Sequence, residues 1–206
     1  MRFSEFVKYC RLIESTSSRK QKVVYIAELV RKSSPEEVAA LVRLLIGRPY
    51  PVHSEYRLDV GPATIYKALR DLRGQRALLA SSEPTVLEVY CTLEKIARAR
   101  GEGSRTRKEL LFKSLLSRVR EEDREYLLRS IFGEMRIGAN EGVVLEALAS
   151  VCGCPLETIR RAYMFIGDLG ELAEIVLTRG REGVENVRLE LFRPVKPMLA
   201  EMAYDL

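Results

Sequence analysis

The feature that most constrains how this chain can fold is an internal repeat. A shift of 86 residues aligns residues 18–47 with residues 104–133 without a gap, and eight aligned pairs are identical. They are Ser18/Ser104, Arg19/Arg105, Lys22/Lys108, Leu29/Leu115, Glu36/Glu122, Leu41/Leu127, Arg43/Arg129 and Gly47/Gly133. Further along, with a small difference in length, residues 60–62 match residues 137–139, and residues 67–69 match residues 146–148. A unit that occurs twice predicts two similar substructures, which can pack about a pseudo-two-fold axis.

Hydrophobic spacing and capping residues predict helices along most of the chain. The expected helices cover residues 2–15, 19–32, 35–46, 62–72, 84–100, 105–119 and 121–132, one that opens at residues 138–141, and two that begin at Pro155 and Asp168 and end near Phe165 and Leu177. Ser18, Ser34 and Ser104 are the expected caps at three of these starts. The predicted fold class is all-α, with about ten to twelve helices in two pseudo-symmetric repeats.

Glycines and prolines mark the connections between these helices. Two prolines and two glycines predict a loop over residues 47–61. After Gly180 the pattern changes, because Val187, Leu189 and Leu191 alternate with polar residues, as in a short strand or an extended linker. We therefore expect a helical domain over residues 1–180 and an extended segment over residues 181–206.

Residues 131–149 predict the end of one helix, a tight turn and the start of another. Gly133 suits the left-handed backbone at a helix C-terminus. Gly138, Asn140 and Glu141 suit the opening of the next helix. Arg136 is left on the turn beside that helix N-terminus, where an arginine and free backbone N–H groups suit a phosphate or a minor groove. The alternative interpretation is an ordinary helix-turn-helix corner with a solvated arginine.

Charge is unevenly distributed along the chain. The formal net charge is +5, and 47% hydrophobic with 31% charged residues is typical of a folded, soluble protein. No window approaches the roughly 18 consecutive apolar residues of a membrane span, so a cytoplasmic location is expected. Residues 98–120 carry eight basic and two acidic side chains, a local excess of +6 that favours a polyanion partner.

Cysteine and histidine content argues against a metal site. The chain has four cysteines and one histidine, and Cys152-Gly-Cys154 is too closely spaced for the usual zinc knuckle. Buried or idle thiols are the simpler interpretation. Arginine outnumbers lysine, a weak indication of a thermophilic source, in which a disulfide is possible even in the cytosol.

The repeat and the basic helix starts together suggest duplex DNA as the polyanion. Two similar units would present two basic helix N-termini side by side, and duplex DNA offers two phosphate backbones related by local two-fold axes. Gly61 and Gly138 would allow a close approach of backbone to backbone. The alternative is an old duplication of a helical hairpin whose basic caps are merely solvated.

Several motifs in order resemble one known family. Residues 134–149, Glu-Met-Arg-Ile-Gly-Ala-Asn-Glu-Gly-Val-Val-Leu-Glu-Ala-Leu-Ala, resemble the signature of the N-terminal DNA-binding domain of ATP-dependent DNA ligases of the archaeal type. Gly103-Ser104 followed by Arg107-Lys108, residues 167–173 and Ser17-Ser18-Arg19 agree with it, and residues 191–200 resemble the linker into that family's adenylation domain. The resemblance extends over essentially the whole chain.

The resemblance implies an all-helical module that grips the minor groove and phosphates of duplex DNA on both sides of a nick, during replication, repair and recombination. The DNA-binding residues expected from the motifs and the repeat are Ser18, Arg19, Lys22, Gly61, Ser104, Arg105, Arg107, Lys108, Arg136 and Gly138. The module is expected to be monomeric and not bound to a membrane. A helical scaffold that docks an acidic protein partner is the alternative function.

Catalysis is not expected from these residues alone. The family's catalytic lysine lies in a Lys-x-Asp-Gly motif, which no lysine here begins, and no glycine-rich phosphate loop is present. The resemblance therefore implies that ATP and Mg²⁺ serve the parent enzyme, that residues 181–206 lead into a truncated adenylation domain, and that this chain, as a fragment, neither self-adenylates nor seals nicks. Gln75, Leu78 and Leu79 resemble a sliding-clamp-binding peptide in which leucines replace the usual aromatics; a surface loop with buried leucines is the alternative.

Overall fold

In the computed structural model, the described residues are 1–51, 54, 56, 58, 60–73, 82–191, 193 and 195, with the side chains of residues 62–64 and 73 excepted. They form ten α-helices and one 3-10 helix, and contain no strand beyond an isolated bridge between Arg2 and Thr85. The all-α prediction is confirmed. The elements are α1 (Phe3–Ser15), α2 (Arg19–Lys32), α3 (Pro35–Leu45), α4 (Pro62–Arg73), α5 (Val86–Arg98), α6 (Ser104–Arg118), η1 (Glu121–Asp123), α7 (Arg124–Phe132), α8 (Glu141–Cys152), α9 (Leu156–Ile166) and α10 (Leu169–Glu185).

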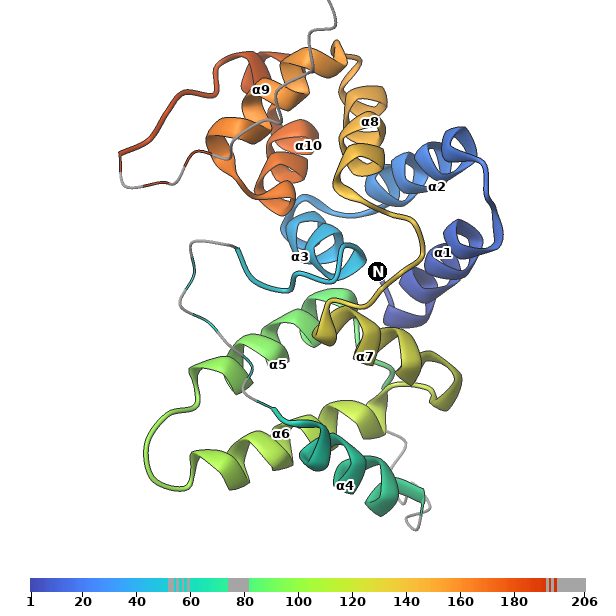
Figure 1. The fold of residues 1–206 in the computed structure, drawn as a ribbon, viewed down its shortest axis with the longest axis vertical. Helices are drawn as coiled ribbons and strands as arrows, with labels where there is room; N and C mark the ends of the chain where they lie inside the picture. Colours follow the sequence, from blue (N-terminus) through green and yellow to red (C-terminus); the bar gives the residue numbers. More distant parts are fainter. Residues whose placement is uncertain are drawn as a thin grey trace, which may run out of the picture.

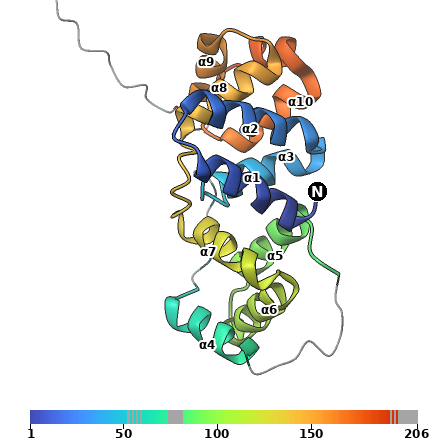
Figure 2. The same ribbon diagram turned by 90° about the vertical axis from the view of Figure 1, so that its right-hand side faces the viewer.

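The helices form two halves stacked along the long axis of the molecule (Figures 1 and 2). One half holds α2, α3, α8, α9 and α10, with α3 packed on α10 and α2 packed on α8. The other half holds α4, α5, α6 and α7, with α6 packed against both α4 and α5. In the sequence repeat, α2 and α4 are the first and third helices of one unit, and α6 and α8 are those of the other. The first helix of each unit therefore packs against the third helix of the other unit, α2 on α8 and α6 on α4.

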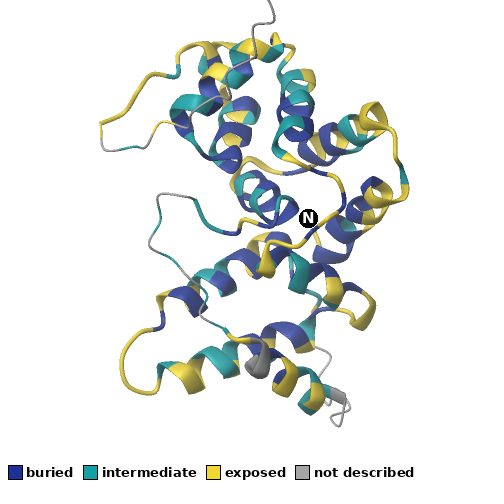
Figure 3. Cartoon of the chain, viewed as in Figure 1, coloured by how far each residue is buried: buried dark blue, intermediate teal, exposed yellow. Residues whose placement is uncertain are grey.

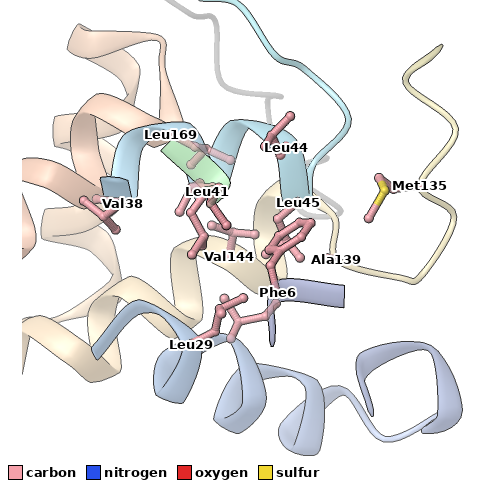
Figure 4. Packing of buried hydrophobic residues seen from close by; sticks show 14 of the residues in the cluster. Phe6, Leu29, Val38, Leu41, Leu44, Leu45, Met135, Ala139, Val144 and Leu169 are labelled. Carbon is pink, nitrogen blue, oxygen red and sulfur yellow. The ribbon is translucent and has the colours of Figure 1, made fainter. Parts of the chain in front are cut away.

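The core is continuous around α3. Its buried side chains Leu41 and Leu45 lie between Phe6 of α1, Val144 of α8 and Ala139 of the segment that precedes α8 (Figure 4). All five are buried. Exposed residues lie on the outer faces of the helices and in the connection 100–103 (Figure 3). Apolar burial of this kind supplies most of the driving force for folding.

Polar residues start several helices as the sequence predicts. Ser18 accepts a hydrogen bond from the Gln21 backbone N–H, and Asn140 accepts one from Val143. In α3 the Ser34 N–H donates to Glu37, half of a capping box. Ser104 is an exception, because it is the first residue of α6 and Gly103, with φ 73°, occupies the cap position without a side-chain hydrogen bond. The prediction of Ser104 as a cap is therefore wrong.

Glycines end α3 and α7, and these two ends touch each other. Gly47 and Gly133 follow the two helices with φ of 68° and 72°. A Cβ atom built on Gly47 would lie 2.8 Å from the Gly133 Cα atom, so a side chain there would collide with backbone. The residues that the repeat pairs at its end thus meet near the junction of the two halves.

Two predicted boundaries differ from the structure. The helix expected over 121–132 is divided into η1 and α7, where the buried Asp123 accepts a hydrogen bond from Arg11 of α1. The last helix does not end near Leu177: α10 continues to Glu185 across a break at Gly180, because Val184 is buried in the core. Residues 187–190 beyond it have no regular structure, which corresponds to the extended linker rather than the strand.

The structure contains one disulfide, between Cys152 at the end of α8 and Cys154; Cys10 and Cys91 are free. Among the described residues, no single helix has the length and apolar character to span a membrane; α8 and α9 together meet those criteria but are bent by 118°.

Candidate nucleic-acid interface

The segment 134–140 presents one arginine on a firmly held turn. Along it, Met135, Ile137 and Ala139 are buried, whereas the residues between them, Arg136 and Gly138, are exposed. Arg136 has φ 47°, and no other non-glycine residue of the described chain has a positive φ. Its guanidinium makes no hydrogen bond or ion pair within that part of the chain. A non-glycine residue in the left-handed region is uncommon and tends to mark functional sites.

Lys22 of α2 lies beneath this turn. Its Nζ atom donates to the Ile137 carbonyl oxygen at 2.6 Å, and the side chain is half-buried. Gly138, with φ 79°, follows at once, and a Cβ atom on it would lie 2.2 Å from Lys22 Nζ. The predicted site residues Lys22, Arg136 and Gly138 are therefore brought together, although the lysine points into the protein and not toward solvent.

The start of α8 adjoins the same turn. Asn140 caps the helix, and Arg19 of α2 lies across its first turns, where it donates to Glu146 with two nitrogens, the shorter distance being 2.7 Å. The hydrogen bond from Arg19 lowers the pKa of Glu146. A partner for α8 was missed by sequence reasoning: Arg48, directly after Gly47, pairs with Glu141. No sequence signal identifies this pair, because the two residues are 93 positions apart.

The start of α6 forms a second basic region. Arg105 is 87% exposed, with only a loose ion pair to Glu109 at 3.6 Å, and Arg107 is exposed without a partner among the described residues. Lys108 donates to the Leu58 carbonyl oxygen at 3.3 Å, and Lys67 of α4 pairs with Glu109 at the same distance. Gly61, at the start of α4, has open space around it.

The structure corrects the expected arrangement of the basic helix starts. They do not lie side by side: the start of α2 and the segment 100–103, which leads into α6, are at opposite corners of Figure 1. The helix pairing explains this separation, because α2 lies next to α8 of the second unit and α6 lies next to α4 of the first unit. Ser18, Arg19 and Lys22 thus belong to one region, and Ser104, Arg105, Arg107, Lys108 and Gly61 to the other.

One edge of the molecule carries parts of both regions. In Figure 2 the segment 133–140 and α4 lie along the same left-hand edge, one in each half. An extended polyanion that followed this edge would pass the segment 133–140 and then α4. The residues Gln75, Leu78 and Leu79 lie outside the described part of the chain. No group of three or more potential metal ligands occurs among the described residues.

Comparison with known proteins identifies the family. The family model described as DNA ligase N terminus matches residues 2–79 and 71–149. The chain is 36% identical over its whole length to DNA ligase 1 of Korarchaeum cryptofilum, covering 41% of that protein, and 32% identical to the DNA ligase of Archaeoglobus fulgidus, covering 42%. A probable DNA ligase of Anaeromyxobacter is 35% identical over 98% of the chain, which covers 38% of it. The chain spans about two fifths of the length of these relatives, and it belongs to the DNA ligase N-terminus family.

Proposed function

We propose that this member of the DNA ligase N-terminus family is a duplex-binding module of an ATP-dependent DNA ligase. It holds the phosphates and minor groove of nicked DNA on both sides of the break and reads no base sequence. Contacts to phosphates supply affinity and register without sequence information, and the exposed cations here are arginines and lysines at helix starts and turns.

The observation that carries the proposal is the turn around Arg136. The residues on either side of it are buried, its own backbone adopts an unfavourable conformation, and its guanidinium is left exposed without an internal partner. A structural arginine would be paired, as Arg43 is with Asp168. An arginine presented in this way, on the segment that leads into α8, suits a phosphate oxygen, because a guanidinium donates charge-assisted hydrogen bonds to phosphates.

Titration of labelled duplexes by the purified chain tests the proposal. Nicked and intact duplexes of two unrelated sequences are compared at two salt concentrations. We expect equal affinity for the two sequences and a steep loss with salt. Arg136→Ala should weaken all duplexes about tenfold and lower the salt slope by about one unit. The matched control is Arg181→Ala on α10, an exposed arginine already paired with Glu185. Equal effects of the two variants would contradict the proposal.

The whole protein is proposed to use ATP and Mg²⁺, as the family implies. The 206 residues are proposed to be inactive by themselves, because no lysine in them begins the Lys-x-Asp-Gly motif. Incubation with labelled ATP and Mg²⁺, followed by a denaturing gel, should give no labelled band. A labelled band would refute this part of the proposal. The division of the chain into a helical domain and a linker to a truncated adenylation domain, the cytoplasmic location and the monomeric state also stay predictions.

A sliding clamp is proposed as a second partner, through Gln75, Leu78 and Leu79. In a pull-down with the cognate clamp, Gln75→Ala and Leu78→Ala should each reduce the amount of this chain that is recovered with the clamp. Unchanged recovery would show that the clamp does not bind through these residues. Competition separates DNA binding from the alternative of a scaffold for an acidic protein. Random-sequence duplex DNA should displace a protein bound to the DNA surface and should leave a scaffold contact intact.

A further inference from the structure

We propose that Lys22 is a positioning residue that holds Arg136 in place for DNA, and is not itself a phosphate contact. This inference rests on the proposed function and assigns a distinct role within that site. From the sequence alone, Lys22 is predicted to contact DNA because of its charge and its place at a basic helix start.

The contacts of Lys22 point inward. Its Nζ atom lies 2.6 Å from the Ile137 carbonyl oxygen, and Ile137 itself is only 2% exposed. The amine also packs so closely on Gly138 that even a methyl group there would collide with it. A lysine in this position would have to leave a charge-assisted hydrogen bond before it could reach a phosphate.

The turn needs such an anchor. Arg136 and Gly138 both have positive φ, one on each side of Ile137. The left-handed conformation of Arg136 is unfavourable by itself and persists only where the surroundings fix it. The upstream side is fixed by Met135, which is buried and accepts a hydrogen bond from Ser130. The Lys22 bond to Ile137 fixes the downstream side, so the backbone of Arg136 is held at both ends.

The second unit supports the same role. Lys108, which the repeat aligns with Lys22, donates to the Leu58 carbonyl oxygen in the segment before α4. Each lysine therefore bonds to a carbonyl oxygen of the segment that leads into the helix packed on its own helix. Lys20, two residues away on α2, is exposed and lacks a bond of this kind to the turn. Direct contact with DNA suits Lys20 better than it suits Lys22.

A double-mutant cycle on the full 206-residue chain distinguishes the two roles. Lys22→Met keeps the apolar stem and removes the amine; it is combined with Arg136→Ala, and affinity for nicked duplex is measured over a series of salt concentrations. We expect each single variant to lose about tenfold in affinity and about one unit of salt slope, and the double variant to lose no more than either. Additive losses, with a slope lower by about two units, would show that Lys22 binds phosphate and would overturn the inference.

Lys20→Met is the matched control, because Lys20 is two residues away on the same helix and exposed. Its effect should add to that of Arg136→Ala. Thermal unfolding of every variant shows whether it is folded under the binding conditions, and Lys22→Arg replaces Lys22→Met if the latter is not.

A measurement without DNA keeps this inference separate from the proposed function. In Lys22→Met, trypsin should cleave the folded chain after Arg136 at least tenfold faster than in the unmodified chain, while cleavage after the other lysines and arginines stays unchanged. Unchanged cleavage after Arg136 would overturn the positioning role. If Arg136→Ala left DNA affinity unaltered while cleavage after Arg136 became faster in Lys22→Met, the proposed DNA site would fail and the role of Lys22 in holding the turn would stand.

Discussion

The segments that follow Gly47 and Gly133 are aligned by the sequence repeat but differ in the structure. Each receives a lysine amine on a carbonyl oxygen, from Lys22 at 2.6 Å and from Lys108 at 3.3 Å. The second segment is tightly packed around two residues of positive φ, whereas Gly61 in the first has open space around it. In sequence, Arg136 aligns with Asp59. The lysine contact occurs in both copies, but the alignment pairs Arg136 with an acidic residue.

The aligned arginines Arg43 and Arg129 show the same divergence. Each lies over a tyrosine ring, Tyr90 at 5.8 Å and Tyr126 at 5.2 Å, and each pairs with a carboxylate. The Arg43 side chain is 14% exposed and its partner Asp168 is buried, whereas the Arg129 side chain is 29% exposed. An ion pair is more sensitive to loss of one partner when it is buried, so similar geometry should give unequal energies.

The largest expected effect is the loss of stability when these two arginines lose a carboxylate partner. Asp168→Ala should lower the free energy of unfolding by about 3 kcal/mol or more, because it leaves the largely buried Arg43 without a carboxylate and removes the cap of α10, where Asp168 accepts from the Glu171 N–H. Glu14→Ala, after which Arg129 still pairs with Glu125, should cost less than about 1 kcal/mol. Urea unfolding of both variants measures the difference. Equal losses would show that burial does not distinguish the two arginines.

The next largest effect on stability is expected at Gly138, compared with Gly61, which the sequence repeat aligns with it. Gly138→Ala should cost about 2 kcal/mol, because the residue has φ 79° and the new methyl group displaces Lys22. Gly61→Ala should change stability by less than about 0.5 kcal/mol, since the methyl group meets nothing. Thermal melts of the two variants, side by side, make the test. A large loss in Gly61→Ala would mean that the two segments are equally constrained.

A smaller effect is expected at Arg136 itself. Arg136→Gly should raise the free energy of unfolding by up to about 1 kcal/mol, because glycine has no penalty in the left-handed region. The same variant should lose DNA affinity as Arg136→Ala does. Unfolding and DNA binding are measured on the same preparation of Arg136→Gly. Higher stability together with lower affinity would show that the strained backbone at this position is retained for DNA binding. A destabilised Arg136→Gly would indicate that the arginine side chain has a structural role.

The smallest effect is on the pH dependence of stability, through the contact between Glu14 of α1 and the side chains of Tyr126 and Arg129 of α7. The hydrogen bond from Tyr126, followed by that from Arg129, lowers the pKa of Glu14. A carboxyl group with a lowered folded-state pKa contributes stability above its unfolded pKa, near 4.3, and loses it as the pH falls through the folded value. The melting temperature of the parent chain should therefore fall between pH 5 and pH 3 more than that of Glu14→Gln. If the melting temperatures of the two proteins fell equally between pH 5 and pH 3, Glu14 would make no pH-dependent contribution to stability.

Most of the helices could be predicted from the sequence, because their signals are local. The capping serine at residue 18, the asparagine at residue 140 and the glycines at residues 47 and 133 all act on backbone within one turn. The turn at Arg136 could be predicted for the same reason. The end of the last helix could not, because Gly180 suggested a stop that the burial of Val184 overrides.

The sequence by itself determined an all-α chain, its repeat and its family, since spacing, capping and motif order are properties of neighbouring residues. Only the tertiary structure decided which helices pair. The first helix of each unit packs on the third helix of the other, which separates the basic helix starts that the repeat alone predicted to be adjacent. Tertiary packing also turned Lys22 inward onto Ile137, 115 residues away. Charge can be read from a sequence, but the direction of a charged side chain depends on distant groups that pack around it.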